Sequence, residues 1–358
     1  WPAVDGGPTG GSRPIAGEDC FVNTGAYILR RLVMIVPVIV GLSILTFVIT
    51  HLVPGDPALL AAGPQATQEM VDQIREEFGM DKPIPVQYVN YVKGLMTGNW
   101  GKSVLSRHPV TKDLRVFWPA TLELVLAAMT IAIVFGIPLG VISAVKHDSW
   151  ADHTSRVYSL MGVSLPSFWL ALLLQWFVAL RFGWLPIGGR LDATMVAPDH
   201  ITGLYVIDGF LTGNLSAVIN ALKHLLLPAF ALSMSPLATI TRMTRSSMLE
   251  VLGQDYIRTA RAKGLRERSV LFRHALRNAF MPTLTMIGLS FGWLMGGSVL
   301  IETIFDWPGI GLYAVNSALT LDFMPIMGIA LIYGVVFSLI NMVIDIMYAF
   351  IDPRIRYG

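Results

Sequence analysis

Two short strings in this sequence contain residue types that carry known chemistry. The first, Gly288-Leu-Ser290-Phe-Gly292, has the spacing found around a serine nucleophile, which needs a base within hydrogen-bond reach and an exposed turn. The string lies inside a long apolar segment, and the only histidine in another such segment is His51, near its end. Glycines at this spacing also let transmembrane helices pack closely. We therefore expect helix packing and no catalytic residue, with an intramembrane serine protease as the alternative of another class.

The second string, Trp100-Gly-Lys102-Ser103, ends like a phosphate-binding P-loop. The first glycine of that motif would fall at Met96, and no strand pattern precedes it. A single cysteine, Cys20, excludes an intramolecular disulfide and any metal site built from several cysteines. We therefore expect that this chain itself binds no nucleotide, metal or other cofactor.

Two carboxylates, Glu123 and Asp345, fall inside apolar segments. Both lie within about two turns of a segment end, where the free-energy cost of a charge in a membrane is smaller. We assign neither as a substrate ligand, and the residues that bind substrate stay unidentified at this point.

The elements that must position these residues are those of a membrane protein. Of the 358 residues, 54% are hydrophobic and 14% are charged, against about 25% charged residues in a soluble domain. The fold class that we predict is all-α, a polytopic membrane protein with six transmembrane helices. The expected spans are Leu32 to Val53, Leu122 to Val145, Val157 to Leu180, Leu225 to Ile240, Pro282 to Leu300 and Ile326 to Phe350.

Positive charge orients these spans. Lys and Arg are enriched on the cytoplasmic side, and alternating sides place the loops 146–156 and 242–281 and both termini in the cytoplasm. Sixteen of the 26 Lys and Arg residues then lie on that side. Most of the others lie in an extracytoplasmic segment, about residues 58–117, where two amphipathic stretches predict short helices. Pro166 permits a kink within the third span.

The chain is expected to have one transmembrane domain, residues 25–358, preceded by a leader, residues 1–24. The leader is rich in Gly and Pro and has no helical or strand period, so we expect it to be disordered or an added extension. Pro54-Gly-Asp-Pro57 is expected to end the first span, because neither Pro nor Gly continues a helix.

The most basic stretch between two spans runs from Asp255 to Ala279. It contains seven Lys and Arg residues against two carboxylates, Asp255 and Glu267, and Gly264 divides it into two short predicted helices. Asp255 is expected to cap the first helix. One interpretation is a basic helical elbow, residues 255–279, that contacts a partner. The other is that these cations only set the topology.

Eight strings spread along the chain favour the first interpretation: PGDP (54–57), GVSLPSFWLALLL (162–174), GWLP (183–186), LLLPAFAL (225–232), RTARAKG (258–264), RHALRNA (273–279), ETIFDWPGIG (302–311) and DPR (352–354). Together, and in this order, they resemble the first permease subunit of the dipeptide/oligopeptide/nickel ABC importer family. The resemblance covers about residue 26 to 358. Within the elbow it is partial, because Arg258 and Thr259 replace the Glu and first Ala of the family's cytoplasmic loop motif.

This resemblance implies a type I ABC importer permease fold, in the plasma (inner) membrane of a prokaryote. The chain would be a pore-forming subunit and not an enzyme. A homologous second permease would complete the pathway, two ATP-binding subunits would hold ATP and Mg, and an extracytoplasmic substrate-binding protein would deliver short peptides. Nickel, glutathione or another small solute is the alternative cargo, and no nucleic acid is involved. A secondary transporter would instead need paired discontinuous helices, and the sequence has no internal repeat.

The resemblance also implies roles for two groups of residues. The first would couple the chain to an ATP-binding subunit: Arg258, Thr259, Ala260, Lys263, Gly264, Leu265, His274 and Leu276. The second would form an outer gate or a docking face, unless it only makes a tight turn: Phe305, Asp306, Trp307, Pro308, Gly309 and Gly311.

Overall fold

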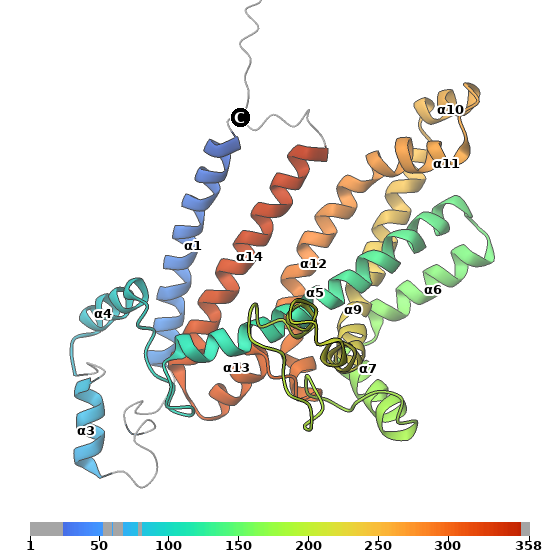
Figure 1. Ribbon diagram of the computed structural model, residues 1–358. Helices are drawn as coiled ribbons and strands as arrows, with labels where there is room; N and C mark the ends of the chain where they lie inside the picture. Colours follow the sequence, from blue (N-terminus) through green and yellow to red (C-terminus); the bar gives the residue numbers. More distant parts are fainter. Residues whose placement is uncertain (1–23, 53–58, 60–66, 78–80, 352–358) are drawn as a thin grey trace, which may run out of the picture.

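Long helices fill most of the described chain (Figure 1). The structure is a computed structural model, and it describes residues 24–52, 59, 67–77 and 81–351. Its longest helices are α1 (Thr24–Leu52), α5 (Val110–Val145), α9 (Leu215–Leu252), α12 (Arg277–Ile304) and α14 (Phe323–Ile351). Five helical stretches are long and apolar enough to cross a membrane, and each of them contains all or most of one of these helices.

Shorter helices connect the long ones. α3 (Gln68–Glu77) and α4 (Ile84–Thr97) follow α1 and confirm the two short helices predicted there. Between α5 and α9 lie α6 (Trp150–Ser164), α7 (Ser167–Leu174), the π-helix η1 (Gln175–Arg181) and α8 (Tyr205–Leu211). α10 (Asp255–Ala262), α11 (Glu267–Ser269) and the π-helix η2 (Val270–Leu276) join α9 to α12, and α13 (Ile310–Leu319) joins α12 to α14. In the described ranges, β-structure is limited to an isolated bridge between Lys102 and Pro109.

The third predicted span, Val157 to Leu180, is broken at Pro166, where its sequence permits a kink. α6 and α7 are separated at Leu165 and Pro166, and their axes differ by 101°. Proline disfavours helical geometry at the residue before it, and Leu165 is accordingly extended, with φ −83° and ψ 125°. The described chain therefore has six spans only if this bent pair counts as one.

The other five predicted spans are confirmed as parts of longer helices, except that Val53, the last residue of the first span, lies outside the described residues. α5 begins at Val110 rather than Leu122, because its first turns also bury side chains, among them Asp113 and Leu114. α9 likewise extends on both sides of the predicted segment. The leader up to residue 23, the PGDP string at 54–57 and the DPR string at 352–354 lie outside the described residues.

α5 and α9 form the centre of the bundle. Gly140 of α5 lies so close to α9 that a Cβ there would be 2.7 Å from the Thr241 carbonyl oxygen. Small residues at such crossings let helices approach in lipid, where van der Waals packing holds them together. The surrounding core draws on α5, α9 and α12, through Leu124, Ala128, Ala132, Leu232, Leu237, Ile240, Leu294 and Met295.

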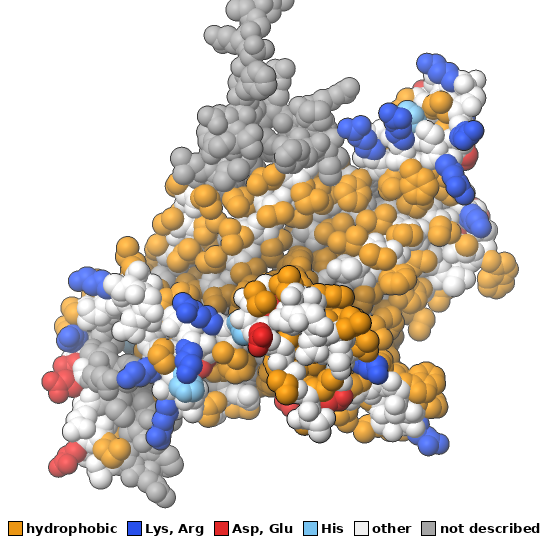
Figure 2. Space-filling model, in the orientation of Figure 1, with side chains coloured by type: hydrophobic (Ala, Val, Ile, Leu, Met, Phe, Trp, Pro, Cys, Tyr) orange, Lys and Arg blue, Asp and Glu red, His pale blue; other side chains and the backbone are white. Residues whose placement is uncertain are grey.

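The two ends of the bundle carry different elements. α10 and α11 lie at one end, here called the elbow end, and α3, α4 and α13 lie toward the opposite end (Figure 1). Figure 2 shows hydrophobic side chains over the middle of the molecule and Lys and Arg side chains gathered toward both ends. This distribution is that of a protein with an apolar belt between two polar surfaces.

Candidate functional site

The elbow, residues 255–279, has the two-part helical structure that its sequence predicts. α10 ends shortly before Gly264, which adopts φ +74°, and the chain then turns into α11 and η2. Glycine adopts a positive φ readily, whereas a Cβ disfavours it. The predicted cap is wrong, because Gln254 precedes the helix and Asp255 is its first residue. The Asp255 carboxylate instead lies 3.4 Å from the Arg258 guanidinium.

The inner face of the elbow is a small hydrophobic core. Ile257 and Val270 have no exposed area, and Ala260 is also buried. They pack with residues of α5, α9 and α12, namely Val141, Ala144, Met248 and Ala279. A helix of one or two turns is marginal by itself in water. The core with the three long helices is therefore what stabilises α10 and fixes its orientation.

The outer face of the elbow is basic and exposed. The Arg258 side chain is 73% exposed, and Arg261 forms an ion pair of 2.8 Å with Glu267 across the turn. Of the eight residues predicted to couple the chain to a partner, Ala260 faces the chain's own core, and His274 and Leu276 are half-buried. The other five lie on the accessible surface: Arg258, Thr259, Lys263, Gly264 and Leu265.

A buried carboxylate that the sequence analysis did not single out joins three helices at the elbow end. Asp152, at the start of α6, has no exposed area. It accepts hydrogen bonds from Ser143 of α5 at 2.5 Å and from Arg245 of α9 at 2.7 and 2.9 Å. Arg156 donates a further bond to it at 2.5 Å. These charge-assisted bonds connect the first half of the bent span to α9, the helix that leads into the elbow.

At the opposite end, the residues that follow α12 are buried within the chain. Phe305 and Trp307 are each 1% exposed, and the Trp307 indole donates to the Ala120 carbonyl at 2.8 Å. Glu302 has no exposed area and accepts from the Thr121 hydroxyl at 2.8 Å and from a backbone N–H in the first turn of α13 at 3.0 Å. A carboxylate at a helix N-terminus is electrostatically favourable. This segment therefore makes a tight, hydrogen-bonded return into α13.

The six residues predicted as an outer gate or docking face are mostly inaccessible. Asp306 is exposed and has φ +48°, and Pro308 is half-buried. The other four are buried: Phe305, Trp307, Gly309 and Gly311. The tight-turn interpretation thus describes the geometry, and the role of these residues in a gate stays a prediction.

We expect Gly309→Ala to lower the free energy of unfolding by about 1–3 kcal/mol, as overpacking a dense core does. A Cβ at Gly309 would overlap the Thr121 hydroxyl and the Glu302 carboxylate. The thermal unfolding midpoint of the purified chain in detergent measures the effect. Gly296→Ala is the matched control, because nothing lies within 4 Å of a Cβ at that position. Equal midpoints for the two variants would contradict the expectation.

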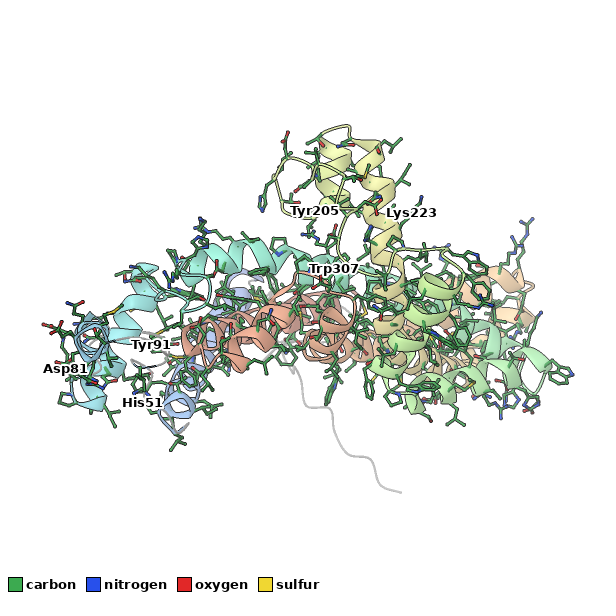
Figure 3. All side chains as sticks on the ribbon, turned by 90° about the horizontal axis from the view of Figure 1, so that it is seen from below. His51, Asp81, Tyr91, Tyr205, Lys223 and Trp307 are labelled. Carbon is green, nitrogen blue, oxygen red and sulfur yellow. The ribbon has the colours of Figure 1, made fainter. Side chains whose placement is uncertain are left out.

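A buried ion pair lies beside this turn. The Arg190 and Glu123 side chains are 6% and 7% exposed and meet at 2.5 Å. Arg190 also donates to the Gly203 carbonyl at 3.0 Å, and its guanidinium carbon lies 3.6 Å from the centre of the Tyr205 ring. Figure 3 shows Tyr205 on a segment that extends beyond the rest of the molecule, with Trp307 at its base. The ion pair therefore connects that segment to α5.

Further contacts hold the same loop in place. The Gly189 N–H donates to the Phe305 carbonyl at 2.8 Å. The Asn220 amide and the His224 ring contact the Asp192 carboxylate, and these hydrogen bonds, that of Asn220 first, hold the pKa of Asp192 below its usual value. The loop after η1 is thus bonded both to α9 and to the turn after α12.

The GxSxG string has the packing role predicted for it. Ser290 is buried within α12. Gly288 and Gly292 lie against Ile344 and Phe337 of α14, where a Cβ would collide with either side chain. The absence of a side chain at both positions lets α12 and α14 approach, which confirms the helix-packing interpretation.

Two other groups that resemble ligand sites are engaged in internal bonds. Ser103, the last residue of the P-loop-like string, is buried and donates to Asp322 at 2.6 Å. His147, Asp148 and Asp152 have the mutual spacing of metal ligands. Both carboxylate oxygens of Asp152, however, already accept from arginines, so this group does not fit a metal ion.

The chain is similar to known transport proteins over nearly all of its length. A family described as binding-protein-dependent transport system inner membrane component matches residues 136–357, and the family of the N-terminal part of such membrane components matches residues 25–110. A dipeptide transport system permease protein of Alkalihalophilus pseudofirmus is 45% identical over 332 residues, which cover 93% of this chain and 99% of the relative. A probable D,D-dipeptide transport system permease protein of Escherichia coli is 45% identical over 327 residues, which cover 90% of this chain and 95% of the relative. A glutathione transport system permease protein of Salmonella choleraesuis is 36% identical over 331 residues, which cover 92% of this chain and 99% of the relative.

Proposed function

The chain belongs to the family of binding-protein-dependent transport system inner membrane components, and we propose that it is a permease subunit of an ATP-driven ABC importer of short peptides. The type I importer permease fold predicted from the sequence is confirmed by the family match. The chain is a multi-pass membrane protein, and the part of it that the structure describes has five apolar spans and one bent pair.

The proposed assembly contains a homologous second permease, two ATP-binding subunits that hold ATP and Mg, and an extracytoplasmic substrate-binding protein. This chain contributes one half of the pathway and no catalytic group. The elbow end and both termini face the cytoplasm of a prokaryotic cell, because most Lys and Arg residues lie on that side of the spans. The opposite end, with α3, α4 and α13, faces outward.

The single observation that supports this proposal best is the two-faced elbow. Its inner core joins α10 to α5, α9 and α12, while its outer face is basic and exposed. A helix held in this way moves as a rigid body with a subunit bound to it, and it tilts the attached spans when the ATP-binding subunits close. Arg258 is the residue that we expect to pair with a carboxylate of the ATP-binding subunit.

Short peptides are the proposed cargo because the relatives named as dipeptide permeases are 42% to 45% identical to the chain. Glutathione, itself a small peptide, is the second candidate, because a relative of 36% identity is named for it. The test is uptake of a labelled dipeptide and of glutathione into vesicles that contain the assembled complex and ATP. Uptake of either compound without ATP would contradict an ATP-driven importer.

We expect Gly264→Ala to lower the ATP hydrolysis stimulated by a loaded binding protein several-fold, and Gly253→Ala to leave it unchanged. Alanine at φ +74° is disfavoured by about 1 kcal/mol, and because nothing lies within 4 Å of a Cβ at Gly264, the effect comes from the backbone alone. Gly253, at φ −79°, accepts alanine without strain. Hydrolysis rates of the complex in lipid measure the difference. Equal rates for the two variants would show that the bend plays no part in coupling.

A further inference from the structure

The loop before α5 and the first turns of α5 carry a group of exposed basic side chains at the end opposite the elbow. Between residues 99 and 117 the sequence contains one carboxylate, Asp113, and it is buried. Five basic side chains in the same stretch are exposed, and we call them the basic patch: Lys102, Arg107, His108, Lys112 and Arg115. Figure 2 shows Lys, Arg and His side chains gathered in the region where Figure 1 places the start of α5.

Buried hydrogen bonds fix this loop. Ser103 donates to Asp322 at 2.6 Å, and Ser106 and Tyr313 donate to Asp113 at 2.5 and 2.8 Å. Both carboxylates and the Tyr313 side chain are buried. Hydrogen bonds to α13 and to Asp322, the residue before α14, therefore hold the segment that carries these basic side chains.

The backbone of the loop is also constrained. An isolated bridge between Lys102 and Pro109 closes it, and Arg107 has φ +57°, which is uncommon for a residue with a side chain. A surface that is ordered before binding loses less conformational entropy when a partner binds. The backbone that carries the basic patch is thus already ordered, which lowers the entropy cost of binding a protein partner.

The patch has no topological explanation of the kind that the elbow has. Cations near a membrane favour the cytoplasmic side, and in the proposed orientation the basic patch faces outward. Two exposed apolar side chains, Leu105 and Val116, lie in the same stretch. Protein interfaces combine apolar contacts with charged ones in this way. Binding to lipid headgroups, in contrast, requires positive charge but no loop of fixed conformation.

We propose that the basic patch is a docking surface for an acidic face of the extracytoplasmic substrate-binding protein. This proposal rests on the proposed function. Opposite charges on two such faces speed association and set the orientation of the bound partner. The interaction would bring the binding protein to the outer end of α5, next to the turn that follows α12.

The test is the affinity of the assembled complex, in nanodiscs of neutral lipid, for the dipeptide-loaded binding protein of the same transport system. The variant Lys112→Glu/Arg115→Glu reverses two charges in the first turns of α5. We expect its Kd to rise about 10-fold at about 50 mM salt, and the difference to shrink at about 500 mM salt, where charges are screened. Lys82→Glu/Lys93→Glu, at two other exposed lysines of the same end, is the matched control and should change the Kd by less than about twofold.

Each outcome decides something. An unchanged Kd in the patch variant, with an unchanged thermal midpoint and normal binding by the wild type, overturns the docking surface and leaves the proposed function standing. A wild-type complex that binds no loaded binding protein overturns the proposed function itself. If the patch variant loses only binding to vesicles that contain phosphatidylglycerol, the patch is a headgroup surface and the docking proposal fails.

Discussion

Replacing Arg190 with methionine is expected to lower the free energy of unfolding by about 3–5 kcal/mol, because removing one partner of a buried ion pair leaves the other charge uncompensated. The Glu123 carboxylate would remain buried with only the Val206 N–H, at 2.8 Å, as a described donor. The cation over the Tyr205 ring would be lost as well. Thermal unfolding in detergent measures the loss, which corresponds to about 4–7 °C at the unfolding entropy per residue of globular proteins.

Two variants make this measurement specific. Arg190→Met combined with Glu123→Gln removes both charges and should recover much of the lost stability, because a neutral replacement of a buried pair is often tolerated. Arg181→Met, at an exposed arginine of η1, is the matched control and should melt like the wild type. A single variant at Arg190 that also melts like the wild type would show that the pair adds nothing to stability.

Ile257→Ala is expected to uncouple the chain from its ATP-binding subunits, with a loss of about 10-fold or more in stimulated ATP hydrolysis. Ile257 has no exposed area and lies in the core that holds α10 to α5, α9 and α12. Truncating a buried isoleucine to alanine costs about 2–5 kcal/mol. An eight-residue helix has little stability of its own to offset this loss, so α10 should open locally while the membrane-spanning core stays folded.

Amide hydrogen exchange separates this effect from general unfolding. The amides of α10 should lose protection in the variant, while those of α9 and α12 keep theirs. Ile142→Ala, at an exposed position of α5 near the same end, is the matched control and should leave both exchange and hydrolysis unchanged. Full protection of α10 in the Ile257 variant, with normal hydrolysis, would argue against the core as the link between the elbow and the spans.

Features that depend on local backbone chemistry were predictable from the sequence. Gly264 permits a positive φ and Pro166 disfavours a helix at the residue before it, and both breaks occur where these residues stand. The apolar runs indicated the spans because the mean hydropathy of a segment depends only on residues that are adjacent in the sequence. The 101° angle between α6 and α7 was not predictable, because packing against other helices sets it and the proline only allows it.

Features that depend on distant pairs were not predictable in this way. Glu123 and Arg190 are separated by 67 positions, and Ser103 and Asp322 by 219. Hydrophobic periodicity does not show which polar residue meets which. Glu123 was expected near a membrane edge, where the free-energy cost of a charge is smaller, whereas in the structure Arg190 balances its charge. A carboxylate in one span and an arginine in the loop after the next were the available signal. For Ala260 the signal was its spacing of three residues from Ile257, which places both on one face of α10.

The core of the elbow also sets an order of biogenesis. Ile257 belongs to one hydrophobic core with residues of α5, α9 and α12, and α12 is synthesised after α10. We therefore expect α10 to become ordered after the ribosome has completed α12 and the three long helices have met. A nascent or truncated chain without α12 lacks part of this core, and we expect it to recruit no ATP-binding subunit. The short surface helix of the elbow thus depends on a span that is made after it.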